Sequence, residues 1–205
     1  MAFPESRALV KLTVFGLCAA PAASLGVDLA DGTLAANPMP EVIRATGIWS
    51  LRLLVLGLAL SPLAGMIGND AIVACRRMIG LFAAFYAAVH LVAWARYYGY
   101  DWPFLIEESF ARQYLTVGLI GAALLVPLAL TSPQRMHAAL GPAAWRRLHA
   151  LIYPTVIAAY AHYVMARRFD WREMAALGAA IALLLGSRLW RALARPADGR
   201  PPAGG

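Results

Sequence analysis

Long apolar segments, separated by short polar ones, are the feature that most constrains how this chain can fold. A helix needs about 20 mostly apolar residues to cross the hydrocarbon core of a bilayer. Composition points to a membrane protein, since 61% of the residues are hydrophobic, 14% are charged and the mean hydropathy is +0.62. We therefore expect an all-α membrane protein, a six-helix transmembrane bundle, with spans at about 9–27, 46–66, 78–96, 114–131, 148–166 and 173–189.

The basic residues predict how this bundle is oriented. If the N-terminus is cytoplasmic, 11 of the 18 Lys and Arg residues fall on the cytoplasmic side, and eight of the 11 Asp and Glu residues fall on the other side. Short cytoplasmic loops are enriched in Lys and Arg, so this distribution predicts that both termini are cytoplasmic (N-in/C-in). Because the net charge of +7 follows the membrane topology, we do not expect nucleic acid as a partner.

The spans leave room for one domain. We expect residues 1–190 to form a single transmembrane domain, and residues 191–205, which are rich in Pro and Gly, to form a disordered tail. The N-terminal stretch RALVKLTVFGLCAAPAASLG also resembles a secretory signal peptide. We expect an uncleaved first helix, and the alternative is cleavage, which would leave five spans in the same orientation. The sequence contains no dinucleotide fingerprint or phosphate-binding loop, so nucleotide chemistry must come from a partner.

Two histidines stand at the same depth in spans that run in the same direction. His90 lies 13 residues after Arg77, and His162 lies 15 residues after Arg147. At 1.5 Å per residue, both are roughly 20 Å above the cytoplasmic arginines and differ in height by about 3 Å. Two facing imidazoles at one depth are what a six-coordinate haem needs as axial ligands. We therefore predict that His90 and His162 bind haem iron; the alternative is two structural histidines bonded to nearby backbone or hydroxyl groups.

His149 begins the fifth expected span, 13 residues before His162. A helix would separate these two side chains by roughly 20 Å along its axis, which would suit two stacked haems. However, Arg76 and Arg77 occupy the matching depth in the third span, and 13 residues turn the two histidines about 140° apart. Pro154 can kink the helix and change that angle. Two interpretations of His149 therefore stay open: a second haem ligand, or part of a cytoplasmic flavin or quinone pocket.

Basic residues near the span ends also have two interpretations. Arg52, near the outer end of the second span, can reach lipid headgroups or neutralise a haem propionate. Four arginines form a cytoplasmic belt that topology explains and that would also anchor a phosphate or an acidic partner: Arg76, Arg77, Arg146 and Arg147. We expect electrons to enter near four residues on this side: Arg76, Arg77, Trp145 and His149.

Five segments, in this order and spread over residues 37–190, resemble one known family. They are NPMPEVIRATGIWSLRLL, LSPL, RRMIGLFAAFYAAVH, FARQYLTVGLIGAALLVPLALTS and LGPAAWRRLHALIYPTVIAAYAHY. The family is MsrQ, the haem-binding membrane subunits of the periplasmic methionine-sulfoxide reductase system, within the ferric-reductase-like transmembrane superfamily. The resemblance implies that the family's haem histidines fall on His90 and His162, its third histidine on His149, and its two-arginine motif on Arg76 and Arg77.

The resemblance also implies a function. It implies a haem b protein of the bacterial inner membrane that also binds FMN. Electrons would come from the quinol pool or a cytoplasmic flavin reductase, and would pass to a periplasmic molybdopterin subunit that reduces methionine sulfoxide in oxidised proteins. This chain would be the electron-transfer subunit rather than the catalytic one. Larger relatives carry a flavin and nicotinamide domain after the membrane part, whereas about 15 residues follow the last expected span here, so we expect an external donor.

Two other functions stay open from the sequence. One is a stand-alone quinol-oxidising cytochrome b or ferric reductase. The other is a non-redox membrane scaffold or transporter, in which the histidines are structural. Transporters usually contain paired broken helices or an intramembrane acid, whereas the later spans here contain Pro127 and Pro154 alone as helix-breaking residues.

Overall fold

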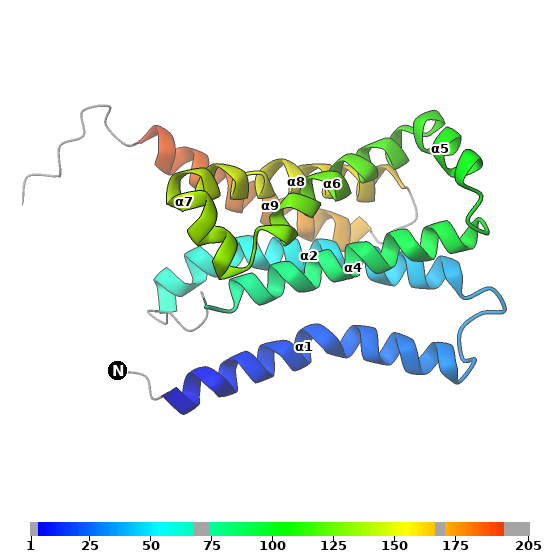
Figure 1. Cartoon of the computed structure of the whole chain (residues 1–205), viewed down its shortest axis with the longest axis horizontal. Helices are drawn as coiled ribbons and strands as arrows, with labels where there is room; N and C mark the ends of the chain where they lie inside the picture. The colour runs from blue at the N-terminus through cyan, green and yellow to red at the C-terminus, as the bar shows by residue number, and fades with distance from the viewer. Residues whose placement is uncertain (1–3, 68–73, 167–170, 195–205) are drawn as a thin grey trace, which may run out of the picture.

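The computed structural model describes residues 4–67, 74–166 and 171–194, which form helices joined by short connections (Figure 1). Within these ranges the structure contains no β-strand, which confirms the expected all-α class. The helices in chain order are α1 (Pro4–Ala30), α2 (Met39–Ile67), α4 (Arg76–Tyr97), α5 (Trp102–Ala111), α6 (Gln113–Leu130), α7 (Gln134–His149), α8 (Ile152–Met165) and α9 (Trp171–Leu193).

Among the described residues, five helices are long and apolar enough to cross a membrane. These segments are Ala8–Ala30, Met39–Met66, Arg76–Tyr97, Gln113–Leu130 and Trp171–Leu193. They correspond to the first, second, third, fourth and sixth spans that the sequence predicts. The sixth has a short apolar stretch in the sequence, but its helix reaches 23 residues because flanking polar residues extend it at both ends.

The fifth expected span, at 148–166, is not one long helix. α8 has 14 residues, fewer than a membrane crossing needs, and a turn at Ala150 and Leu151 separates it from α7. Pro154 has no N–H to donate to the carbonyl of Ala150, so the regular helical bond is missing there. Instead, the N–H of Tyr153 bonds to that carbonyl, three residues back, at 3.1 Å. The expectation of six long helices is therefore met by five.

Two segments expected as connecting loops are helical. α5 begins after Asp101, whose carboxylate accepts the N–H of Phe104 at 3.2 Å, and Pro103 stands in its first turn. α7 bends sharply at Gly141, where φ is 75°, a left-handed conformation that glycine adopts without a steric cost. The bend folds the two halves of α7 toward each other.

The core lies between two pairs of helices. α2 packs along α4, and α6 packs along α8, and contacts of α2 with α8 and of α4 with α6 join the two pairs. The side chains of Leu58, Ile79, Ala83, Tyr86 and Val156 are almost fully buried where these helices meet. Because His90 is on α4 and His162 is on α8, each pair of helices contributes one of the two histidines.

α1 lies alongside α4 and apart from the α6–α8 pair (Figure 1). Tyr86 of α4 links the two helices: its hydroxyl accepts the N–H of Ala22 at 3.0 Å and donates to the carbonyl of Cys18 at 2.8 Å. In an uninterrupted helix these two backbone groups would bond to each other. A side chain inserted in this way is a known cause of local bending.

Carboxylates and one group of arginines lie toward opposite ends of the bundle. The carboxylates whose side chains the structure describes lie at or near the end that carries α5: Asp28, Asp31, Glu41, Asp101, Glu107, Glu108 and Glu173. The opposite end, where α2 ends and α4 begins, carries a different set of residues: Arg76, Arg77, Arg135, Arg146, Arg147, Arg188 and Arg191.

Candidate functional site

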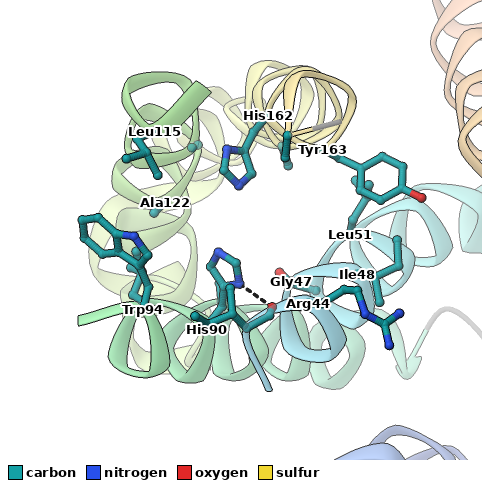
Figure 2. A pocket seen from close by; sticks show the side chains of 18 of the residues that line it. Arg44, Gly47, Ile48, Leu51, His90, Trp94, Leu115, Ala122, His162 and Tyr163 are labelled. Carbon is teal, nitrogen blue, oxygen red and sulfur yellow. Dashed lines mark hydrogen bonds between the residues drawn. The ribbon is translucent and has the colours of Figure 1, made fainter. Parts of the chain in front are cut away.

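His90 and His162 face each other across the middle of a cavity. Their ring centres are 6.1 Å apart and their planes are inclined at 85° (Figure 2). His90 points inward from α4 and His162 points inward from α8, from opposite sides of the open space. The structure therefore brings together the two histidines that helical rise placed at one depth.

Each of these rings bonds to the backbone of a neighbouring helix. His90 Nδ1 lies 2.8 Å from the carbonyl oxygen of Ile43 on α2, and His162 Nδ1 lies 2.7 Å from the carbonyl oxygen of Tyr114 on α6. A carbonyl can only accept, so in both rings Nδ1 carries the proton. Neutral rings of this tautomer present the lone pair of Nε2, the form in which imidazole binds a metal.

The cavity has a volume of about 800 Å³, within the range of about 300–1,000 Å³ that is usual for cofactor sites. Apolar side chains line most of it, including Leu51, Leu54, Leu91, Leu119 and Leu125. Polar groups stand toward the end that carries α5: Glu41, Arg44, Tyr97, Tyr98 and Tyr114. Burial raises the pKa of the Tyr98 phenol, which therefore stays protonated at neutral pH.

The separation of the two rings fits a metal between them. Two metal–nitrogen bonds of about 2 Å, and about 1.1 Å from each ring centre to its nitrogen, together give about 6 Å. The distance between ring centres is 6.1 Å. A flat apolar macrocycle suits the leucine-rich walls, and Arg44 is the cation that lines the cavity. The donor set and the shape of this site therefore fit a haem.

Arg52 is directed elsewhere. Its Nε donates to Glu173 Oε1 at 2.8 Å, which joins α2 to α9, and its guanidinium lies 4.8 Å from the ring centre of Trp49. Arg52 is absent from the cavity lining, which contains Arg44 instead. Neither lipid headgroups nor a propionate is needed to account for the position of this side chain.

A second group of aromatic residues lies at the opposite end of the molecule. The ring of His149 stacks on Trp145, with centres 3.9 Å apart and planes at 22°, and His149 Nε2 lies 3.1 Å from the hydroxyl of Thr131. The Trp145 indole N–H donates to the carbonyl of Thr131 at 3.1 Å. The ring centre of His137, on the other side of the bend in α7, lies 5.0 Å from that of Trp145.

The arginine pair lies at this same end and outside the cavity lining. Arg76 Nη1 is 3.4 Å from the hydroxyl of Ser61, and the like charge of Arg188 repels its guanidinium. Both Arg76 and Arg77 are exposed. Over the described residues, no group of three His, Cys, Asp or Glu side chains is arranged to hold a metal ion by itself.

Sequence reasoning did not identify four residues that shape the histidine pair. Ile43 and Tyr114 act through backbone carbonyls, for which a sequence carries no signal. The ring of Tyr114 also stacks on His162, with centres 5.9 Å apart. Gly47 and Gly118 line the cavity beside the two rings. Each follows one of the two carbonyl residues by four positions, but this spacing has a meaning only when the helices that contact the histidines are known.

Comparison with known proteins identifies the family. The model of the ferric reductase like transmembrane component matches residues 46–160, more than half of the chain. A protein of Xanthomonas campestris pv. campestris (strain 8004) is 41% identical over 191 residues, which cover 89% of this chain and 87% of that protein. A protein of Caulobacter vibrioides is 40% identical over 185 residues, with 86% and 87% covered.

A third relative, from Xanthomonas axonopodis pv. citri (strain 306), is 39% identical over 208 residues and covers 94% of both chains. All three are named protein-methionine-sulfoxide reductase heme-binding subunit MsrQ. No solved structure matches this chain. The five long apolar helices and these relatives identify a multi-pass protein of the bacterial inner membrane. The chain belongs to the MsrQ family of the ferric-reductase-like transmembrane proteins.

Proposed function

We propose that this protein is a haem b electron-transfer subunit of the inner membrane. It takes electrons from quinol or from a cytoplasmic flavin reductase, and delivers them to a periplasmic molybdopterin enzyme that reduces methionine sulfoxide in oxidised proteins. The names of the relatives support haem binding and membership of a methionine-sulfoxide reductase system. The observation that carries the proposal is the facing pair His90 and His162, 6.1 Å apart.

The protein's own residues hold and orient the cofactor. His90 and His162 would hold the haem iron, and the Ile43 and Tyr114 carbonyls keep each Nδ1 protonated and each Nε2 available. When bound, haem supplies an iron centre that accepts and releases one electron. The leucine-rich walls would exclude water from the bound group, and Arg44, which lines the cavity, would offer a positive charge to its carboxylates.

We propose six membrane crossings, with both termini cytoplasmic, and one domain over residues 1–190. The fifth crossing, at 148–166, would consist of the end of α7, the turn at Ala150 and Leu151, and α8. His162 of α8 supports this, because it faces His90 of the long helix α4. The described carboxylates lie toward one end of the bundle while seven arginines lie at the other, and this asymmetry supports the orientation. Of the expected tail at 191–205, residues 191–193 belong to the helix α9, and the part from 195 onward lies outside the described residues.

We propose that electrons enter at the end that carries Trp145, His149, Arg76 and Arg77. Thr131 donates its hydroxyl proton to the carbonyl of Pro127 at 2.6 Å, so its oxygen can only accept from His149 Nε2. In this arrangement His149 Nε2 carries the proton, whereas a ligand to iron offers a lone pair. This favours a role of His149 in a flavin or quinone pocket, with FMN as one occupant, over a role as second haem ligand.

The test is the haem content of purified protein, measured by the pyridine haemochrome assay together with flavin analysis. His90→Ala and His162→Ala should each abolish the reducible b-type spectrum, because each removes one axial ligand. His137→Ala, a histidine outside the cavity, is the matched control and should keep it. Colourless wild-type protein from haem-replete cells, or a normal spectrum in both alanine variants, would overturn the proposal in favour of a non-redox membrane protein.

A separate experiment tests the partner. Deleting the gene of the periplasmic molybdopterin enzyme should abolish oxidation of the reduced haem by methionine sulfoxide in membranes. Turnover that persists with quinol and a ferric salt as the acceptor would instead indicate a stand-alone ferric reductase.

A further inference from the structure

Two glycines stand directly against the two histidine rings. A Cβ atom built on Gly47 would lie 2.8 Å from His90 Nδ1, and one built on Gly118 would lie 2.7 Å from His162 Nδ1. Cβ atoms in proteins are essentially never found within 3.0 Å of another heavy atom in this way. Any side chain at either position would therefore displace the ring, or the helix that carries it.

Both rings are seated by the same construction. Gly47 is four residues after Ile43, whose carbonyl receives His90 Nδ1, and Gly118 is four residues after Tyr114, whose carbonyl receives His162 Nδ1. Residues four apart lie one above the other on the same face of a helix. The missing side chain thus leaves a notch directly beside the carbonyl, and the imidazole fills the notch to reach it.

The close approach is specific to these positions within α2 and α6. On α2, a Cβ on Gly57 would meet Ile79 at 3.9 Å and one on Gly65 would meet nothing within 4 Å. On α6, a Cβ on Gly121 would make contacts of 3.5 Å, which are ordinary van der Waals distances. Among the described glycines of α2 and α6, only Gly47 and Gly118 would place a Cβ atom within 3.0 Å of another side chain, and in both cases that side chain is a histidine.

We propose that Gly47 and Gly118 are positioning residues that set the electronic properties of the iron centre. This rests on the proposed haem ligation by His90 and His162. The notches hold the two ring planes at 85° and hold each Nδ1–H on its carbonyl. Axial ligands and the hydrogen bonds behind them tune the iron, since a bonded Nδ1–H makes Nε2 a stronger donor and favours the ferric state.

The wild-type protein provides the first test, and it needs no variant. Perpendicular imidazole planes give a ferric low-spin EPR signal with one dominant large g-value, whereas parallel planes give a rhombic signal with three resolved g-values. We expect the first form in the oxidised holoprotein. A rhombic signal would overturn the proposal, because the notches would then not fix the ring planes.

The second test compares Gly47→Ala and Gly118→Ala with Gly65→Ala on α2 and Gly80→Ala on α4, where added Cβ atoms meet open space. The first two variants should lose the Nδ1–H bond. We expect a shift of the EPR signal, a more positive midpoint potential and a loss of haem affinity of about 10–100-fold. The two control variants should match the wild type in all three measurements.

The outcomes separate this inference from the proposed function. If His90→Ala and His162→Ala lose the haem while Gly47→Ala and Gly118→Ala keep the wild-type signal and potential, the positioning role is wrong and haem ligation stands. If the histidine variants keep the spectrum, ligation itself is wrong. A glycine variant that loses thermal stability but binds haem with an unchanged potential indicates a packing role alone, which also overturns the inference.

Discussion

The two regions that contain histidines use opposite nitrogens of the ring. His90 and His162 donate Nδ1–H to backbone carbonyls and turn Nε2 into a cavity of about 800 Å³. His149 donates Nε2–H to Thr131 and lies flat against Trp145. Membrane depth and residue type are therefore insufficient to identify a haem ligand. What decides is which ring nitrogen the fold leaves without a proton, and whether that nitrogen faces an open space.

The largest effect is expected from removing the histidines themselves. His90→Ala and His162→Ala should leave no low-spin haem, whereas His149→Ala should keep the haem content of the wild type, because its Nε2 carries a proton. Haem content per protein and the reduced-minus-oxidised spectrum measure this. Loss of half of the haem in His149→Ala would contradict this distinction between the histidines and show that His149 binds a second haem.

A smaller effect is expected at the region that contains His149. Trp145→Ala removes the ring stacked on His149 and the N–H bond to Thr131. Losing one stacking contact and one hydrogen bond costs about 1–2 kcal/mol, or about tenfold in an equilibrium constant. We expect a reduction of that size in the rate at which a quinol or flavin donor reduces the haem, measured by stopped flow, with unchanged haem content. An unchanged rate would place electron entry elsewhere.

Within the histidine pair, Tyr114 offers a finer test. Tyr114→Ala removes the ring stacked on His162 but keeps the carbonyl that receives Nδ1. An aromatic pair contributes about 0.5–1.5 kcal/mol beyond buried area, so haem affinity should fall by about 2–10-fold. Titration of the apoprotein with haem measures this. A complete loss of binding would mean that the ring, and not the carbonyl, positions His162.

The smallest effect is expected for the ion pair between α2 and α9. Arg52 and Glu173 are 38% and 32% exposed, so the pair lies at the surface of the bundle and not in its core. Glu173→Gln should lower the free energy of unfolding by at most about 1 kcal/mol and should leave the haem midpoint potential unchanged. A shift of the potential in Arg52→Gln would instead show that Arg52 reaches a propionate.

The similar depth of the two histidines could be predicted from helical rise, although a turn at Ala150 and Leu151 interrupts the helix between Arg147 and His162. Counting residues from Arg77 and Arg147 is enough to put His90 and His162 at one height. The position of Arg52 could not be predicted in this way, since its partner Glu173 is 121 residues away in sequence and meets it through tertiary packing. Which ring nitrogen of His149 carries the proton likewise depends on tertiary packing, through its contact with Thr131 at the end of α6.

Errors in the helix boundaries have local causes. The helix α5 carries a recognisable start, with Asp101 as the capping residue and Pro103 in the first turn, but its charged residues are typical of an exposed connection. In the segment 148–166, continuous hydrophobicity indicates a span, whereas Pro154 interrupts the backbone bonding. Hydropathy reflects the polarity of the side chains, and it carries no information on whether each backbone N–H has a hydrogen-bond partner.

The bridge made by Tyr86 bears on how the protein is assembled in the bilayer. α1 is synthesised before α4, and until α4 arrives the N–H of Ala22 and the carbonyl of Cys18 lack the phenol that connects them. Unsatisfied backbone groups cost several kcal/mol in hydrocarbon. Tyr86 provides a partner for both groups only after the third long apolar segment lies beside the first in the bilayer, so this contact forms late in assembly.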